Sequence, residues 1–159
     1  LTTATTLMVT LGEFDLTDIA EARHELELLC GRLAAERREQ RHLDQMKDEI
    51  EVQKQDGLSD EECCASDVRF HRALVDATGN RVLQFLMHTV LEALQPVENM
   101  IIFRFRDREM TIRQHRKILK AIRSGDVKRA ERAVTGQMIY LTEQFARAQA
   151  SRSLQTASG

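Results

Sequence analysis

The sequence is poor in residues that interrupt helices and in residues that favour strands. Its 159 residues include seven glycines and one proline, about 5 % of the chain against roughly 12 % in average proteins. Tryptophan is absent and tyrosine occurs once. These shortages argue against a β-sandwich, a β-barrel and a disordered chain. The composition therefore predicts one all-α globular domain.

Long apolar runs and an excess of positive charge are also missing. Charged residues interrupt the most apolar stretch, which excludes a transmembrane helix. The net charge of −2 is a poor match for a nucleic-acid backbone. The N-terminal stretch has no basic leader, so it does not resemble a signal peptide. Cysteines are odd in number and two are adjacent, which favours a reducing, cytoplasmic location over a disulfide framework (Cys30, Cys63 and Cys64).

Capping and stop signals predict six helices in one domain over residues 15–150. Residues 1–14 lack a helical period and form a lead-in, and residues 151–159 form a flexible tail. Ser59 and Asn80 are N-cap candidates, Gly125 is a helix stop, and Pro96 should kink or end the fourth helix. The predicted helices cover about 16–41, 42–56, 59–79, 81–96, 108–124 and 127–150, with an irregular link over 101–107.

Several polar residues fall on the apolar faces of these helices. Asp67 and His71 are four residues apart on one helical face, together with Phe70 and Leu74. His115 lies at the centre of another apolar face. Arg23 and Glu27 share a third. By the same test, His88 faces away from the apolar side of its helix.

Gln137 lies in the middle of the apolar face of the last helix. Counted from the turn at Gly125, His115 and Gln137 are both about 15–16 Å along their helices. They are therefore at the same height if these two helices are antiparallel neighbours.

Asp67, His71 and His115 can bind one divalent metal ion through two imidazoles and a carboxylate. Gln137 can add a weak oxygen ligand or hold a water molecule. The guanidinium of Arg23 matches the carboxylate of a small organic acid. Simpler interpretations remain open at this point: Asp67 and His71 can pair with each other, His115 can be a core histidine, and Arg23 can pair with Glu27.

The order of these residues resembles one protein family. The chain is similar to the FCD domain, the C-terminal effector-binding domain of the FadR subfamily of GntR transcription regulators, over about residues 15–150. The resemblance lies in Asp18-Ile-Ala-Glu-Ala-Arg23-His-Glu-Leu-Glu27, Asp67-Val-Arg-Phe-His71-Arg-Ala-Leu74, Ala77-Thr-Gly-Asn80, Gln114-His115-Arg-Lys-Ile-Leu-Lys-Ala-Ile122 and Gly125-Asp126.

The resemblance implies an antiparallel bundle of six or seven helices around a central ligand pocket. In many members an Asp and three His bind a divalent metal, commonly zinc or nickel, which helps to hold a small carboxylate effector. Asp67, His71 and His115 occupy three of these four positions, and Gln137 stands where the third histidine is expected. The change to Gln137 weakens the expected metal site.

The resemblance also implies a homodimeric regulator whose winged helix-turn-helix binds operator DNA. Nothing in this sequence resembles that DNA-binding motif. Because the sequence starts at Leu1, we expect it to be a fragment. Two other functions remain open. One is a metal-dependent enzyme that acts on a small carboxylate, with Glu27 as the best remaining general base. The other is a dimerisation module with an empty pocket.

Overall fold

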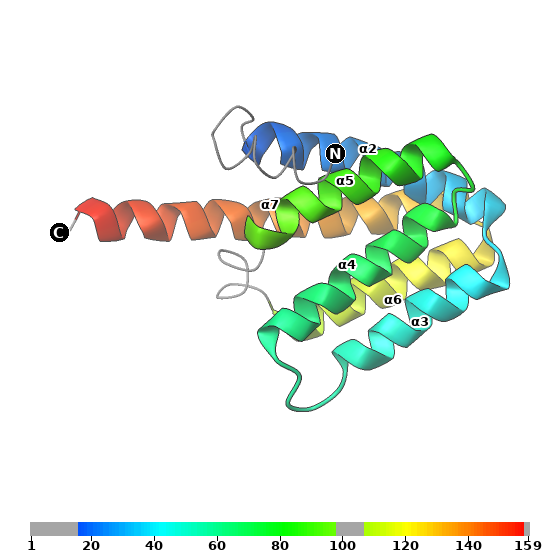
Figure 1. Cartoon of the computed structure of the whole chain (residues 1–159), viewed down its shortest axis with the longest axis horizontal. Coiled ribbons are helices and arrows are strands. Elements are labelled where there is room, and N and C mark those ends of the chain that lie inside the picture. The colour runs from blue at the N-terminus through cyan, green and yellow to red at the C-terminus, as the bar shows by residue number, and fades with distance from the viewer. Residues whose placement is uncertain (1–15, 98–106, 158–159) are drawn as a thin grey trace.

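The computed structural model describes residues 16–97 and 107–157, and this part of the chain is an all-α bundle, which confirms the predicted fold class. Each helix runs in the opposite direction to the one before it (Figure 1). The helices are α2 (Leu16–Arg37), α3 (Gln40–Gln53), α4 (Asp60–Asp76), α5 (Arg81–Val97), α6 (Arg108–Ser124) and α7 (Val127–Ala157).

Local sequence signals account for the helix ends. Ser59 and Glu62 form a capping box at the start of α4, where the Ser59 hydroxyl accepts a hydrogen bond from the Glu62 backbone. Asp107 caps α6 by accepting from the Met110 N–H. Gly125 ends α6 in the left-handed conformation, with φ of 73°. A side chain is strained at that angle, so glycine is the favoured residue there.

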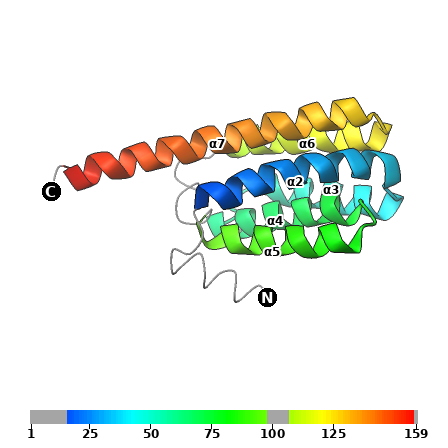
Figure 2. The same cartoon turned by 90° about the horizontal axis from the view of Figure 1, so that it is seen from above.

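The helices pack into one unit with α2 in contact with α4, α5, α6 and α7. Figure 2 shows α7 lying along α2 and α6, and its C-terminal part extending beyond the other helices. Gly31 allows the close approach of α2 to α7, because a Cβ atom there would lie 2.8 Å from Cγ2 of Val134. A larger residue at this position would push the two helices apart.

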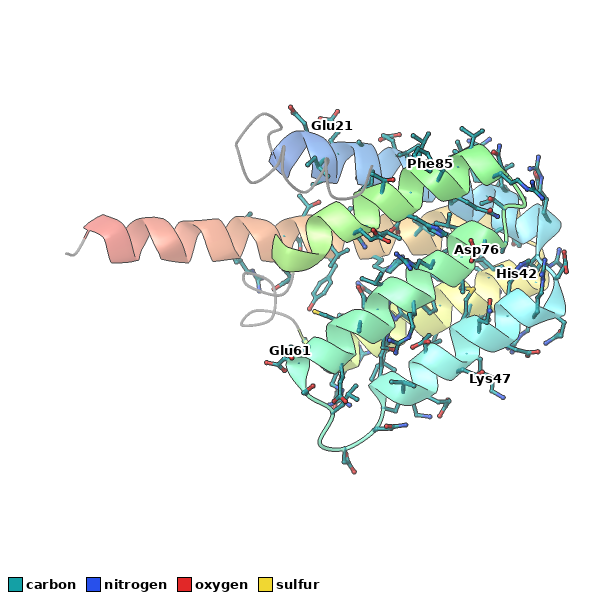
Figure 3. All side chains as sticks on the ribbon, viewed as in Figure 1. Glu21, His42, Lys47, Glu61, Asp76 and Phe85 are labelled. Carbon is teal, nitrogen blue, oxygen red and sulfur yellow. The ribbon has the colours of Figure 1, made fainter. Side chains whose placement is uncertain are left out.

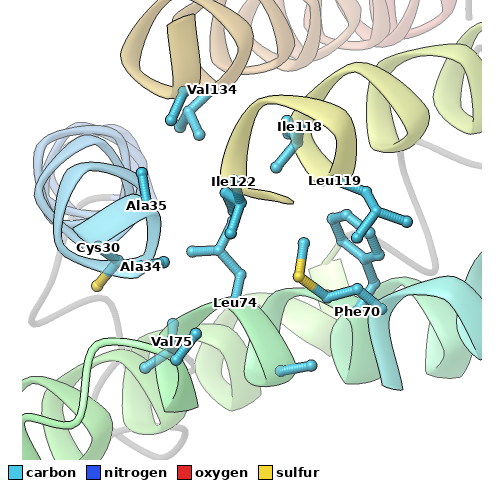
Figure 4. Packing of buried hydrophobic residues seen from close by; sticks show 14 of the residues in the cluster. Cys30, Ala34, Ala35, Phe70, Leu74, Val75, Ile118, Leu119, Ile122 and Val134 are labelled. Carbon is cyan, nitrogen blue, oxygen red and sulfur yellow. The ribbon is translucent and has the colours of Figure 1, made fainter. Parts of the chain in front are cut away.

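The apolar core is formed by α2, α4, α6 and α7, with further side chains from α3 and α5 (Figure 4). Phe70, Leu74, Ile118 and Ile122 are all fully buried. This packing supplies most of the favourable free energy of folding, because removal of apolar surface from water is the main driving force.

Several helix ends differ from those predicted: α3 begins at Gln40 and ends at Gln53, and α4 ends at Asp76, each two or three residues before the predicted position, and two further ends differ by more. The helix α2 ends at Arg37 and not near residue 41, because Glu39 has an extended backbone and starts α3, its N–H donating to Nδ1 of His42. The helix α7 continues to Ala157 and does not end near residue 150, so residues 151–157 belong to this helix. They contain neither glycine nor proline, and extending an existing helix requires no new nucleation.

Some predictions fall on residues outside the described ranges. The lead-in over residues 1–14 and most of the link over 101–107 lie there. Pro96 is the penultimate residue of α5, consistent with a helix that ends close to it. Among the described residues, none of the helices is long and apolar enough to cross a membrane.

Candidate metal centre

The structure brings together the polar residues that the sequence placed on apolar helix faces. Asp67 and His71 lie one turn apart on α4 and are 2 % and 0 % exposed. His115 lies on α6 and Gln137 on α7, and both are buried. Four side chains from three helices therefore meet inside the bundle, where each polar group needs a partner.

Asp67, His71 and His115 have the donor atoms of a metal site. Oδ1 of Asp67 lies 3.2 Å from Nε2 of His115 and 4.0 Å from Nε2 of His71. One ligand atom from each residue lies within 4.8 Å of the other two. Two imidazole nitrogens and one carboxylate oxygen form a donor set that suits a first-row divalent metal such as zinc or nickel.

Gln137 lies directly against the two histidines. Its amide nitrogen is 2.9 Å from Nε2 of His115 and 3.2 Å from Nε2 of His71. The contact with His115 agrees with the prediction that the two residues lie at the same distance from the turn between α6 and α7. Its amide oxygen is buried and has no hydrogen-bond partner in the described part of the chain. An amide can exchange these two atoms by rotation, so the residue fits a site in which its oxygen faces a cation.

Glu27 holds the far side of His71. Its Oε2 lies 3.1 Å from Nδ1 of His71, and its Oε1 accepts from Nε of Arg23 at 3.1 Å. The Arg23–Glu27 pair, which was the simpler alternative for Arg23, is therefore present, and both residues are buried. Burial raises the pKa of Glu27, but the stronger combined effect of His71 and Arg23 lowers it to about 2.

This low pKa argues against the enzyme interpretation. Glu27 was the best candidate for a general base apart from the three candidate ligands. A general base is most effective when its pKa is near the working pH. A carboxylate with a pKa of about 2, held between an arginine and a histidine, is a weak base at neutral pH. The contacts of Glu27 point to a structural role.

Gln53, the last residue of α3, contacts His115, and this contact was not predicted from the sequence. Its Oε1 lies 2.8 Å from Nδ1 of His115, and the residue is fully buried. Arg108 at the start of α6 donates from Nε to the Gln53 carbonyl at 2.7 Å and fixes this end of α3. Helical spacing could have indicated that Gln53 is buried, because it lies on the same face of α3 as the buried residues Met46 and Ile50.

Aromatic packing fixes the ring of His115. The rings of Phe70 and His115 are stacked, with centroids 3.9 Å apart and an angle of 12° between the planes. His88, in contrast, is partly exposed and lies near Asp76, with 3.3 Å between Nε2 and Oδ1. It takes no part in the cluster, as its place on the helix predicted.

Comparison with protein-family models identifies the domain. A protein-family model for the FCD domain matches residues 18–138, which is more than half of the chain and includes every residue of the cluster. No curated protein matches the chain.

Proposed function

Because the chain belongs to the FCD domain family, the C-terminal effector-binding domain of GntR-family regulators, we propose that it senses a small organic carboxylate with the help of a divalent metal ion. Asp67, His71 and His115 would hold the metal, with Gln137 at the edge of the site. The main support for this proposal is that these three residues are buried together, with their donor atoms within 4.8 Å of one another.

Each residue has a defined part in this proposal. A bound zinc or nickel ion supplies a positive centre for a carboxylate. Arg23 adds a second positive charge from α2, next to Glu27 and one contact away from His71. Guanidinium and carboxylate groups match in shape, so Arg23 can orient the acid. Gln137 would lower the metal affinity relative to a histidine, because an amide oxygen is a weaker ligand than an imidazole.

The central pocket for the acid remains a prediction. In the described structure the Gln137 amide lies against both imidazoles, so entry of a metal and an acid requires this side chain to move. A movement on α7 reaches α2 and α6, which both pack against that helix. Effector binding can then favour one arrangement of the bundle over another, provided that its affinity differs between them.

We further propose that the domain forms a homodimer through α5. Val82, Phe85 and Leu86 occupy one face of this helix and are 67 %, 49 % and 43 % exposed. Figure 3 shows Phe85 on the outer side of α5. Adjacent exposed apolar side chains are typical of an interaction site. Operator DNA would be bound by a separate domain of the regulator, whose spacing the dimer sets.

The metal is tested on protein purified without added metal or chelator. We expect bound zinc or nickel by elemental analysis, and a higher Tm after either ion is added to depleted protein. His115→Gln should abolish both signals, while the control His88→Gln changes a histidine outside the cluster and should retain them. Repeated absence of metal, with no Tm shift in the wild type, would contradict the proposal.

The effector is tested by a thermal-shift screen of organic acids with and without zinc. A hit that raises Tm only in the presence of zinc supports joint binding by metal and Arg23, and Arg23→Lys should weaken it because lysine lacks the bidentate geometry. Turnover of the acid would favour the enzyme. Failure of every acid to shift Tm would favour a bare dimerisation module.

The dimer is tested by light scattering after size-exclusion chromatography. Phe85→Glu places a charge in the proposed interface and should give a monomer. Ile139→Glu changes a side chain of similar exposure on α7, 51 %, and should leave the dimer intact. A wild-type monomer, or equal effects of the two variants, would exclude this face.

A further inference from the structure

The Gln137 amide contacts the cluster-facing nitrogen of both histidines. Nδ1 of His71 lies beside Glu27, and Nδ1 of His115 lies beside Gln53. In each ring, Nε2 is therefore the nitrogen on the side of the cluster. The amide nitrogen of Gln137 lies 3.2 Å from Nε2 of His71 and 2.9 Å from Nε2 of His115. One side chain of α7 thus engages both nitrogens that a metal ion in the cluster would need.

These contacts and metal binding exclude each other at both nitrogens. An imidazole nitrogen has one bonding position in the plane of its ring, which holds either a proton or a lone pair. The contact with the Gln137 amide uses this position on each Nε2, whichever way round the amide is placed. Coordination of zinc at about 2.0–2.1 Å uses the same position. Both contacts must therefore break before the two histidines bind a metal ion through Nε2.

The burial of Gln137 makes its amide an effective competitor. The residue is 1 % exposed, so its amide stays close to the two rings. Two hydrogen bonds of ordinary net strength correspond to about a 5- to 150-fold change in an equilibrium constant. The side chain can return little of this to a bound ion, because an amide oxygen is a weak ligand that water can replace. The contacts of Gln137 therefore stabilise the metal-free domain more than the metal-bound one.

We infer that Gln137 is an internal competitor of the metal ion, and that removal of its side chain raises the metal affinity of the cluster. The inference rests on the proposed use of Asp67, His71 and His115 as ligands. It does not require that the wild type binds metal. The opposite result is expected if Gln137 acts mainly as a ligand, because its loss would then lower the affinity.

The affinity is measured on depleted protein, with zinc in competition with a chelating dye. Gln137→Ala removes the amide and should raise the zinc affinity about 5- to 150-fold. Gln137→Ser is a second variant that keeps a small polar group, and it should raise the affinity in the same direction. Gln144→Ala is the matched control, because Gln144 is a buried glutamine two turns farther along the same face of α7. It should bind zinc as the wild type does.

Urea unfolding measures the same competition without a dye. In depleted protein, Gln137→Ala should be less stable than the wild type, because it lacks the two contacts. In saturating zinc the difference should shrink, because the wild type has then given up these contacts as well. A merely structural role of Gln137 predicts an equal loss of stability with and without zinc.

The outcomes separate the inference from the proposed function. If the wild type binds no metal and Gln137→Ala binds zinc, the inference holds and the proposed metal function of the wild type fails. If the wild type binds zinc and the two Gln137 variants bind it no more tightly, only the inference fails. If neither the wild type nor the variants bind zinc or nickel, both fail. Tighter binding by the variants, next to measurable binding by the wild type, supports both.

Discussion

The two ends of the bundle bury different kinds of side chain on the same helices. Toward the turn at Gly125, the inner faces of four helices are apolar. Farther from it, the same faces carry polar groups. We call these regions the turn end (Cys30, Ala34, Leu74, Ile118, Ile122 and Val134) and the cluster end (Arg23, Glu27, Asp67, His71, His115 and Gln137).

The difference separates stability from binding. Burial at the turn end contributes free energy in proportion to the apolar surface removed from water. At the cluster end, the cost of burying charges is offset only where each has a partner, and well-packed apolar residues are often as stable as a buried ion pair. Folding alone therefore does not require the cluster end, which fits a region retained for a ligand.

The largest loss of stability is expected from a substitution at the turn end. Leu74→Ala should lower the free energy of unfolding by about 2–5 kcal/mol, because Leu74 is fully buried and its loss leaves a cavity. Urea unfolding measures the change, and zinc should not restore the loss. Leu29→Ala, at a position 37 % exposed, is the control with a small effect. A loss at Leu74 as small as that at Leu29 would remove the distinction between the ends.

At the cluster end, acid should lower the free energy of unfolding by about 3 kcal/mol, because Glu27 becomes protonated. The pKa of Glu27 is about 2 in the folded protein and 4.5 in the unfolded chain, so its contribution is fully present above pH 4.5 and is lost as the pH falls toward 2. Urea unfolding of depleted protein at several pH values measures it. Glu27→Gln should be less stable than the wild type at pH 7, and the gap should close near pH 2. A gap that is independent of pH would contradict the low pKa.

The smallest effects are expected at the helix caps, which should not distinguish the two ends. Ser59 caps α4 beyond the cluster end, and Asn80 caps α5 beyond the turn end, where its Oδ1 accepts from Val82 and Leu83. Ser59→Ala and Asn80→Ala should each cost about 1 kcal/mol, with or without zinc. Thermal unfolding of the two variants checks this, and a zinc-dependent cost at either cap would tie that cap to the site.

Much of the fold could be predicted because its signals are local. Helical spacing, the Ser59 capping box and the Gly125 stop define α4 and α6 without reference to the rest of the chain. The ends of α2 and α7 were wrong because they depend on weak preferences. An extended Glu39 ended the first, and the absence of a breaker let the second continue to Ala157.

The cluster was predictable in part for a related reason. Asp67 and His71 are neighbours on one helix, and the heights of His115 and Gln137 follow from their distance to one turn. The contact of Gln53 with His115 joins residues 62 positions apart on different helices. No local pattern contains that pairing.

Local sequence patterns define which helices form, which faces are buried and which polar groups those faces carry, because each follows from periods of three and four residues. The pairing of the buried groups depends on how the helices pack. Glu27 contacts both Arg23 and His71, and Gln53 contacts His115, because α2 and α3 pack beside α4 and α6. Hydrogen bonds and ion pairs act over a few ångströms, so the identity of a partner depends on how the helices are placed.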